Sequence, residues 1–314
     1  MTPSDLARKL AFARSRGCIA TLDPSDTIAD VDDAYRVQAE LAALDKDGVR
    51  GWKVTALTAP EQRKFSSSRP VAGALLGQYV YAGPAGVALS SMILPLLECE
   101  VAFTLAVDLP AQAAPYQLAD VEAAVEDIVA VIEIADSRVP SNSPDLLKLA
   151  DCMSNGALVT GGRVSGRKKI DLSKIDILLK HNGKELERGH SSRIRGNPWL
   201  ALLALANAQP LPAGGLRKGQ IITTGTCTSP IELIRGEYVA DFQSLGTVQL
   251  TVTRIRFSLK FGFPLLLKRF DALQAILVPH TDYVNLVFVP KASLQRHGHR
   301  CANGGFYRLS GGRT

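Results

Sequence analysis

From about residue 71 onward, the sequence consists of short runs rich in β-branched and other apolar residues, each bounded by glycine or proline. Runs of this length and composition predict strands of a sheet rather than long helices. The clearest runs span 96–107, 127–136, 155–160, 174–180, 219–224 and 245–253. Because so many short strands must bury their apolar faces against one another, the sequence predicts a fold built mostly on β-sheet.

Helices are expected mainly before this β-rich region. Residues 4–16 and 28–44 have the apolar spacing of amphipathic helices. A further helix is predicted over 198–207, because Asn197 is a good N-cap and the proline that follows suits the first helical position. The pattern as a whole predicts an α+β fold, mostly β, with helices on its N-terminal side.

The composition is that of a globular protein, with 46% hydrophobic and 21% charged residues, which excludes a disordered or collagen-like chain. The five cysteines lack paired C-x-x-C spacing. This argues against a zinc ribbon, an iron–sulfur cluster and a secreted disulfide framework, so a reducing, cytoplasmic setting is expected. The N-terminal segment has no continuous apolar run, and no window holds about 18 uninterrupted apolar residues. Neither a signal peptide nor a membrane span is therefore expected.

The basic charge of the chain is concentrated in residues 254–314. This tail contains ten basic and two acidic residues, hence a net charge of +8, whereas the whole chain carries +6. Residues 1–253 are therefore slightly acidic and give no electrostatic reason to expect nucleic-acid binding. Two interpretations of the tail stay open: a basic appendage that binds RNA, an acidic partner or a membrane surface, or a poorly ordered, non-native extension. The sequence favours the second, because the aromatic and basic residues of the tail recur at no helix or strand spacing.

The most informative run is Leu96–Phe103, in which two glutamates are separated by one residue. Side chains two apart on a strand point to the same face, so Glu98 and Glu100 are expected together, with Cys99 facing the other way. Two carboxylates so close repel each other unless one is protonated or a cation lies between them, and a hard divalent ion is the usual solution. The alternative is a solvent-facing strand, and the pair taken alone favours that alternative.

Two further charged residues lie within apolar runs. Glu133 belongs to the run that starts at Ile128, and a buried glutamate must be paired, protonated or bound to a metal. An ion pair with an arginine such as Arg138 is the alternative to a metal. Lys53 lies within a predicted strand over 50–57, and its alternative is a lysine that reaches solvent from a half-buried strand.

Eight short motifs occur in an order that resembles a known family. They are Asp-Asp-Ala-Tyr-Arg-Val-Gln (32–38), Gly-Trp-Lys-Val (51–54), Glu-Cys-Glu-Val-Ala-Phe (98–103), Ile-Glu-Ile-Ala-Asp-Ser-Arg (132–138), Ala-Asp-Cys-Met-Ser-Asn-Gly (150–156), Asn-Pro-Trp-Leu-Ala-Leu-Leu-Ala-Leu-Ala-Asn (197–207), Lys-Gly-Gln-Ile-Ile-Thr-Thr-Gly-Thr (218–226) and Leu-Gly-Thr-Val (245–248). The order resembles the 2-keto-4-pentenoate hydratase branch of the fumarylacetoacetate hydrolase superfamily, which also contains 4-oxalocrotonate decarboxylases. We accordingly divide the chain into an N-terminal helical region with the first strand (1–70), a fumarylacetoacetate hydrolase-like catalytic domain (71–253) and the basic tail (254–314).

The resemblance implies a rolled, mixed β-sandwich with N-terminal helices and a divalent metal, Mg²⁺ or Mn²⁺, held by three carboxylates. Carried over by position, the metal ligands are Glu98, Glu100 and Glu133. Lys53 matches the catalytic lysine of the family, and it is expected to hold or pass a proton if an apolar site lowers its pKa.

The resemblance also implies the substrate and the reaction. Asp151 and Ser154 fall in the motif that lines the substrate pocket, and Thr224 matches the threonine beside the substrate carboxylate. The expected enzyme is a hydro-lyase that adds water to a short 2-hydroxy-dienoic or 2-oxo-enoic acid, giving a 4-hydroxy-2-oxo acid in aromatic meta-cleavage degradation. A homo-oligomer, and a complex with a family decarboxylase or aldolase, are implied in the same way.

Two alternatives to the hydratase stay open. One is a 2-oxo acid decarboxylase of the 4-oxalocrotonate type, which a free cation opposite the metal would favour. As a departure from the family pattern, the loop Gly189–Arg195 is more basic than its counterpart in the family. The other is a non-catalytic binding protein that uses the basic tail. The chain has no histidine before His181, so the histidine–glutamate pair of superfamily hydrolases has no counterpart, which argues against C–C hydrolysis.

Overall fold

The computed structural model describes residues 2–166, 169–212, 214–254, 273–279 and 284–290. The chain divides into two compact units, Met1–Arg256 and Phe257–Thr314. The expected N-terminal region and catalytic domain both lie within the first unit. In the second unit, strands β14 (Leu273–Pro279) and β15 (Val284–Pro290) pair antiparallel. The rest of the tail, on which its two interpretations depend, lies outside the described residues.

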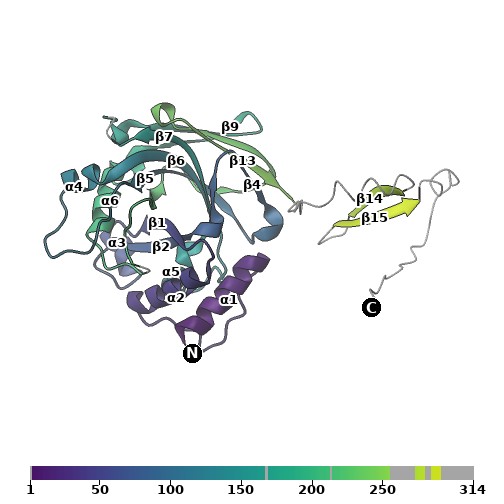
Figure 1. The fold of residues 1–314 in the computed structure, drawn as a ribbon, viewed down its shortest axis with the longest axis horizontal. Coiled ribbons are helices and arrows are strands. Elements are labelled where there is room, and N and C mark those ends of the chain that lie inside the picture. The colour runs from purple at the N-terminus through teal and green to yellow at the C-terminus, as the bar shows by residue number, and fades with distance from the viewer. Residues whose placement is uncertain (1, 167–168, 213, 255–272, 280–283, 291–314) are drawn as a thin grey trace. The chain divides into compact units, whose positions relative to one another are not determined.

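Most strands of the first unit form one large mixed sheet (Figure 1). Within the described residues, its order is β2-β1-β10-β5-β6-β7-β3, and β11 pairs with β5. Strand β1 runs parallel to β10 and β3 runs parallel to β7, whereas the other neighbours are antiparallel. The strands are β1 (Val49–Thr55), β2 (Val71–Leu76), β3 (Val80–Ala82), β5 (Leu96–Leu105), β6 (Val125–Ala135), β7 (Asn155–Ser165), β10 (Ile221–Thr226) and β11 (Ile231–Glu232).

A second mixed sheet has the order β4-β13-β12-β8-β9 within the described residues. Its strands are β4 (Ala85–Ala88), β8 (Asp176–His181), β9 (Lys184–His190), β12 (Gly236–Asp241) and β13 (Thr247–Thr253). The two sheets meet where β7 passes the start of β13. A Cβ atom on Gly162 would lie 2.9 Å from the Cα atom of Gly246, so glycine at both positions permits this close approach.

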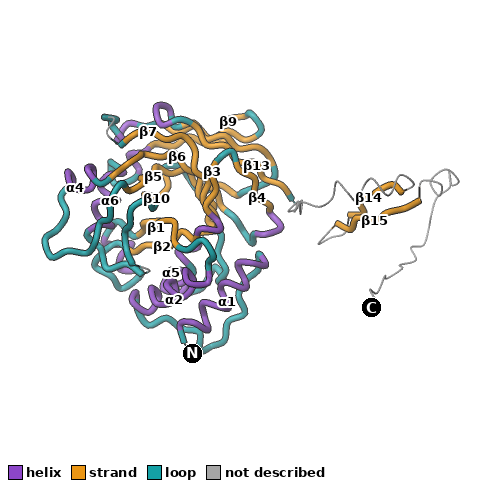
Figure 2. The backbone as a smooth tube through the Cα atoms, in the orientation of Figure 1, coloured by secondary structure: helices purple, strands orange, loops and turns teal. Residues whose placement is uncertain are grey.

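Apart from α3, the described helices of the first unit form two groups. They are α1 (Pro3–Arg16), α2 (Val31–Leu44), α3 (Ala59–Arg63), α4 (Leu118–Ala123), α5 (Asp145–Ala150) and α6 (Pro198–Ala206). Helices α1, α2 and α5 gather on the side of the sheet where β1 and β2 lie (Figure 2), and α6 packs against α4 and the middle of the sheet. Helix α6 begins as predicted, with Asn197 accepting the Trp199 N–H at 3.1 Å. No described helix is long and apolar enough to cross a membrane.

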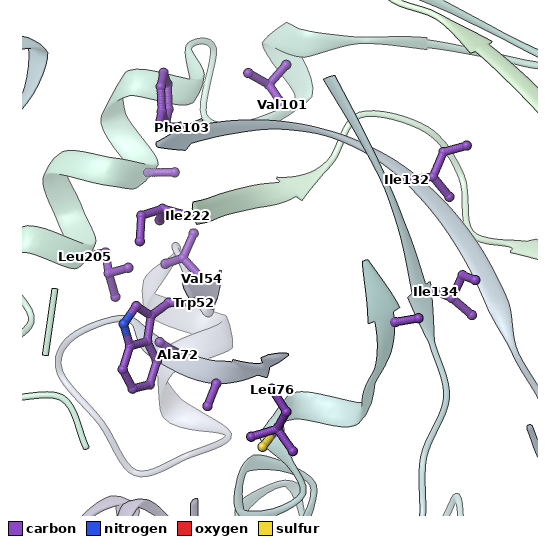
Figure 3. Close-up of a cluster of buried hydrophobic side chains, with 14 of the residues drawn as sticks. Trp52, Val54, Ala72, Leu76, Val101, Phe103, Ile132, Ile134, Leu205 and Ile222 are labelled. Atoms are coloured by element: carbon purple, nitrogen blue, oxygen red, sulfur yellow. The ribbon is translucent and has the colours of Figure 1, made fainter. Parts of the chain in front are cut away.

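One face of the large sheet carries the main hydrophobic core (Figure 3). Trp52 of β1, Phe103 of β5 and Ile132 of β6 are all fully buried there, together with Leu205 of α6. The Phe103 ring stacks on Trp199 with centroids 4.3 Å apart. Helix α6 therefore covers this face with its buried residues Trp199, Leu202 and Leu205, whereas Leu200 on the same helix is exposed.

The opposite face of the large sheet, called here the inner face, is also buried. It carries a smaller apolar cluster formed by Leu75, Ala102, Val129, Val131, Leu158 and Ile221. Strands buried on both faces read as nearly continuous apolar runs, which is how β5 and β6 read in the sequence. The structure confirms the predicted α+β fold that is mostly β. Any charged side chain on the inner face needs a partner.

Candidate metal centre

Three glutamates converge on the inner face of the large sheet. Glu98 and Glu100 lie two apart on β5, and Glu98 is directly opposite Glu133 in the antiparallel register with β6. These positions share the face of Ala102 and Val129, so the carboxylates continue the inner apolar cluster. One ligand atom from each glutamate lies within 4.8 Å of the others. Alternation along β5 and the antiparallel register of β5 with β6 therefore bring the predicted metal ligands together.

The structure contradicts two alternatives that the sequence left open, a solvent-facing strand for Glu98 and Glu100 and an ion pair of Glu133 with Arg138. Glu100 is 1% exposed and Glu133 is fully buried, and Glu98 is partly buried. A solvent-facing strand is therefore wrong for the Glu98–Glu100 pair. The expected alternative partner of Glu133, Arg138, instead binds Asp151, with its Nε 2.9 Å from Asp151 Oδ1.

Lys53 reaches the same face from β1. Strand β10 lies between β1 and β5, and it pairs parallel with β1 so that Lys53 is opposite Thr223. The Lys53 Nζ atom lies 2.6 Å from Glu133 Oε1, and the lysine side chain is only 11% exposed. The alternative of a lysine that reaches solvent is therefore wrong. Lys53 forms an ion pair inside the protein.

Hydrogen bonds from neutral donors hold two of the carboxylates. Glu133 Oε1 accepts a hydrogen bond from Asn155 Nδ2 at 3.0 Å, in addition to the contact with Lys53. Glu100 Oε2 accepts the backbone N–H of Gly225 at 2.8 Å. Glu133 Oε2 is buried and has no hydrogen-bond partner among the described residues. A buried carboxylate oxygen without a donor is costly, and a bound cation would satisfy it.

The electrostatics of the trio favour a cation. Burial raises the pKa of Glu100 well above its ordinary value, and the negative charges of Glu133 and Glu98 raise it further. Burial also raises the pKa of Glu98. Three ionised carboxylates and one ammonium would leave a net charge of −2, which a single divalent ion neutralises. The residues present therefore fit a hard divalent metal.

The expected lowering of the Lys53 pKa is wrong. Burial is the largest single influence and acts to lower the pKa of Lys53, but Glu133, Glu98 and Glu100 together outweigh it and raise the pKa above 10.5. The apolar strand around Lys53 predicts a lowered pKa, whereas the carboxylates that raise it lie on other strands of the sheet. At neutral pH the lysine is protonated.

The predicted substrate residues lie in two places. The Asp151 carboxylate is fully buried and is bound by Arg138, and Arg14 Nη2 lies 3.9 Å away. Ser154 is partly buried in a 3-10 turn between α5 and β7. Thr224 is fully buried, and its hydroxyl donates to the Val101 carbonyl at 2.7 Å. Thr224 thus precedes the Gly225 N–H that holds Glu100, whereas Asp151 belongs to a separate buried ion pair.

Asn155 and the Gly225 N–H are parts of the site that the sequence argument missed. Asn155 was visible only as one letter of a family motif, and a backbone N–H carries no signal in a sequence. A register shift between β6 and β7, described below, determines that Asn155 faces Glu133. Alternation along β7 alone would not have found it.

Comparison with solved structures defines the class of fold. The 4-oxalocrotonate decarboxylase from Pseudomonas putida G7, complexed with magnesium and adipate, has a TM-score of 0.67 and 23% sequence identity. The similarity covers 80% of this chain and 97% of that one. The fold is therefore of the fumarylacetoacetate hydrolase type, as the sequence predicted.

Comparison with curated proteins shows the family, although no protein-family model matches the chain. The 2-keto-4-pentenoate hydratase from Burkholderia vietnamiensis is 30% identical over 257 residues, which cover 80% of this chain and 97% of the relative. The 2-keto-4-pentenoate hydratase 2 from Dechloromonas aromatica is 31% identical over 254 residues, which cover 79% and 96%. The chain belongs to the 2-keto-4-pentenoate hydratase family, and these two relatives carry the name of a hydratase, which is a hydro-lyase.

Proposed function

We propose that the chain is a divalent-metal-dependent hydratase in aromatic catabolism. It adds water to a short 2-hydroxy-dienoate or 2-oxo-enoate and yields a 4-hydroxy-2-oxo acid. The observation that carries this proposal is the convergence of three glutamates, with ligand atoms within 4.8 Å of one another, beside a buried lysine. The hydratases of Burkholderia vietnamiensis and Dechloromonas aromatica support the reaction class.

Glu98, Glu100 and Glu133 would hold the metal. Carboxylate oxygens are the ligands of hard divalent ions, so we propose Mg²⁺ or Mn²⁺. The magnesium in the complex of the Pseudomonas putida G7 decarboxylase supports this choice. When bound, such an ion supplies Lewis-acid stabilisation of the negative charge that develops on the C2 oxygen of the substrate.

Lys53 would hold the proton that the reaction moves. A lysine is ordinarily protonated at neutral pH, and Nζ lies 2.6 Å from Glu133 Oε1, so we assign Lys53 as a proton donor to the substrate. Its ion pair with Glu133 fixes Nζ at the edge of the carboxylate trio. No covalent bond between the protein and the substrate is needed for this chemistry.

The substrate contacts of Asp151, Ser154 and Thr224 rest on the family resemblance. Asp151 and Thr224 use their polar atoms within the protein, so we propose that they shape the site around the substrate. Ser154 is the one of the three that is not fully enclosed, and we propose its hydroxyl as a direct contact. The homo-oligomer and the complex with a family decarboxylase or aldolase stay predictions.

The proposal is tested by adding 2-hydroxypenta-2,4-dienoate to the full chain and following the loss of its ultraviolet absorbance. Turnover is expected with Mg²⁺ or Mn²⁺ and is abolished by EDTA. Glu98→Gln removes a charged ligand and is expected to lower turnover by about a hundredfold or more, because a Lewis acid contributes several kcal/mol to the transition state.

Glu126→Gln is the matched control for this variant. Glu126 is an exposed glutamate on β6, and its substitution should leave turnover within about twofold of the wild type. Turnover that needs no divalent ion, or a Glu98→Gln variant with wild-type turnover, would contradict the proposed metal centre.

A decarboxylase acting on a dicarboxylate is the second candidate, because a basic loop lies beside the site. Buried Ile194 places its Cδ1 atom 3.3 Å from where a Cβ on Gly225 would be. Arg193 and Arg195 flank it and are exposed, and a guanidinium turned toward the site would bind a second carboxylate. The 4-oxalocrotonate decarboxylase from Pseudomonas putida, 27% identical over 232 residues, bears the name of this activity. With a dicarboxylic 2-oxo-enoate, released carbon dioxide identifies the decarboxylase, and a 4-hydroxy-2-oxo product identifies the hydratase.

A further inference from the structure

The Glu133 carboxylate uses its two oxygens differently. Oε1 receives both Asn155 Nδ2 at 3.0 Å and Lys53 Nζ at 2.6 Å. Oε2 is buried and has no partner within the described part of the chain. In a carboxylate that rotates freely, either oxygen can face a ligand. Two donors bound to one oxygen prevent this rotation and leave the other oxygen for the ligand.

A β-bulge places Asn155 on the inner face. In the pairing of β6 with β7, Glu133 is opposite Leu158, whereas Ala135 is opposite Asn155, so the register shifts by one residue. Ala135 is two residues from Glu133 and shares its face, and the shift therefore turns Asn155 toward Glu133. The extra residue is Gly156, where a Cβ atom would lie 2.8 Å from the Asp136 Cβ and 2.9 Å from the Ile134 carbonyl oxygen. Glycine is needed at this point of the bulge.

A buried arginine holds Asn155 in this position. Arg138 Nη2 donates to the Asn155 carbonyl at 2.9 Å, and Nε donates to Asp151 Oδ1 at 2.9 Å. The Arg138 backbone N–H also donates to Asp151 Oδ2 at 2.8 Å. Because Arg138 follows β6 and Asn155 begins β7, these bonds connect the end of the strand that carries Glu133 with the start of the strand that carries its donor.

The turn before Asn155 is strained, which indicates that its surroundings hold it. Cys152, Met153 and Ser154 have φ values of 53°, 52° and 57°, in the left-handed region. This conformation costs roughly 1–2 kcal/mol for each non-glycine residue and persists only where other interactions enforce it. The Arg138–Asp151 pair spans this turn and provides such interactions.

We propose that Asn155 is a positioning residue that directs Glu133 Oε2 toward the divalent ion, and that the Arg138–Asp151 pair holds Asn155 in register. This inference rests on the proposed function. An amide donor suits the position because it holds the carboxylate without neutralising the charge that the cation needs. Groups that orient metal ligands typically change metal affinity by about 10- to 100-fold when they are mutated.

The test is Mn²⁺ binding to the full chain stripped of metal, with free Mn²⁺ measured by electron paramagnetic resonance. Asn155→Ala is expected to weaken Mn²⁺ binding by about tenfold or more. The side chain of Asn155→Ser is too short to reach Glu133 Oε1, so this variant should show the same loss of Mn²⁺ affinity. It replaces the alanine variant in the test if that variant does not fold. Thr160→Ala is the matched control, because Thr160 is another buried polar residue of β7 and contacts Tyr81 instead.

The outcomes separate this inference from the metal centre itself. Wild-type Mn²⁺ affinity in the folded Asn155 variants, or an equal loss in Thr160→Ala, overturns the role of Asn155. Glu133→Gln provides the second arm. If Glu133→Gln binds Mn²⁺ as tightly as the wild type, the proposed metal centre is wrong. If Glu133→Gln loses Mn²⁺ affinity and the Asn155 variants do not, the metal centre is supported and only the positioning role of Asn155 is contradicted.

Discussion

Tyr35 is a buried phenol whose titration differs from that of a tyrosine in water. The residue is 7% exposed, and its hydroxyl oxygen accepts the Ala72 N–H at 3.0 Å. Burial raises the pKa of Tyr35 from 10.0 to about 12, and the hydrogen bond from Ala72 opposes this shift only in part. The neutral phenol is therefore a component of the folded state.

This pKa shift predicts a loss of stability at alkaline pH. Between pH 10 and about 12 the folded chain keeps the Tyr35 proton while the unfolded chain releases it. The stabilisation that the neutral Tyr35 gives to the folded state is thus fully present below pH 10. The free energy of unfolding then falls by about 2 kcal/mol as the pH rises to about 12. Tyr35→Phe lacks this group, so the difference in unfolding free energy between wild type and variant should shrink over that window. Urea unfolding measures it, and a difference that stays constant contradicts the shift.

The charged residues of the site were predictable from the sequence, whereas their connections were not. Alternation along β5 was enough to place Glu98 and Glu100 on one face. The pKa of Lys53 was predicted in the wrong direction, because the number of carboxylates near it depends on which strand lies beside β1. The position of Asn155 could not be predicted, because the extra residue at Gly156 exchanges the two faces of β7 beyond the bulge. A bulge of this kind leaves no periodic signal in the sequence.

Helix α2 protects the exposed edge of the large sheet. Strand β2 is the edge strand, and Gln38 of α2 is fully buried against it. The Gln38 side chain donates to the Ala72 and Leu149 carbonyls at 3.1 and 2.7 Å, and it accepts the Ala74 N–H at 2.9 Å. These bonds satisfy backbone groups that an uncovered edge would offer to another strand. They also connect α2 to the carbonyl of Leu149 in α5.

Gln38→Leu is predicted to destabilise the fold by about 2–4 kcal/mol, because it leaves buried backbone groups without partners at similar side-chain volume. Thermal or urea unfolding of the full chain checks this value. Gln249→Leu is the control, since Gln249 is an exposed residue of β13 and the same substitution there should change the unfolding free energy by less than about 0.5 kcal/mol. Equal effects of the two substitutions would show that Gln38 does not hold the edge.

At the scale of elements, long apolar runs were easier to predict than short strands. The runs 96–107 and 127–136 became β5 and β6 with small changes at their ends. Strands β3 and β4 have only three and four residues, too few for alternation to be recognised. The parallel pairing of β1 with β10 joins segments far apart in the chain, and nothing local in either segment indicates it.

All residues assigned to the site lie in the unit Met1–Arg256, which is the part of the chain with little net charge. A chain that ends at residue 256 is therefore predicted to keep Mn²⁺ affinity and turnover within about twofold of the full chain. The same absorbance and Mn²⁺ measurements test this directly. If the shortened chain lost both properties while its unfolding temperature stayed the same, the basic tail would be part of the function, as the binding-protein alternative requires.

The parallel pairing of β1 with β10 has a consequence for how this protein is made. Lys53 is among the early residues to leave the ribosome. Its ion pair with Glu133 depends on β10, which lies between β1 and β5 and is synthesised near the end of the first unit. A nascent chain halted before Ile221 already contains every proposed metal ligand and the lysine, yet it lacks β10, the strand that lies between β1 and β5. Activity during translation should accordingly begin abruptly, at the length that frees β10, and not rise in proportion to the chain already made.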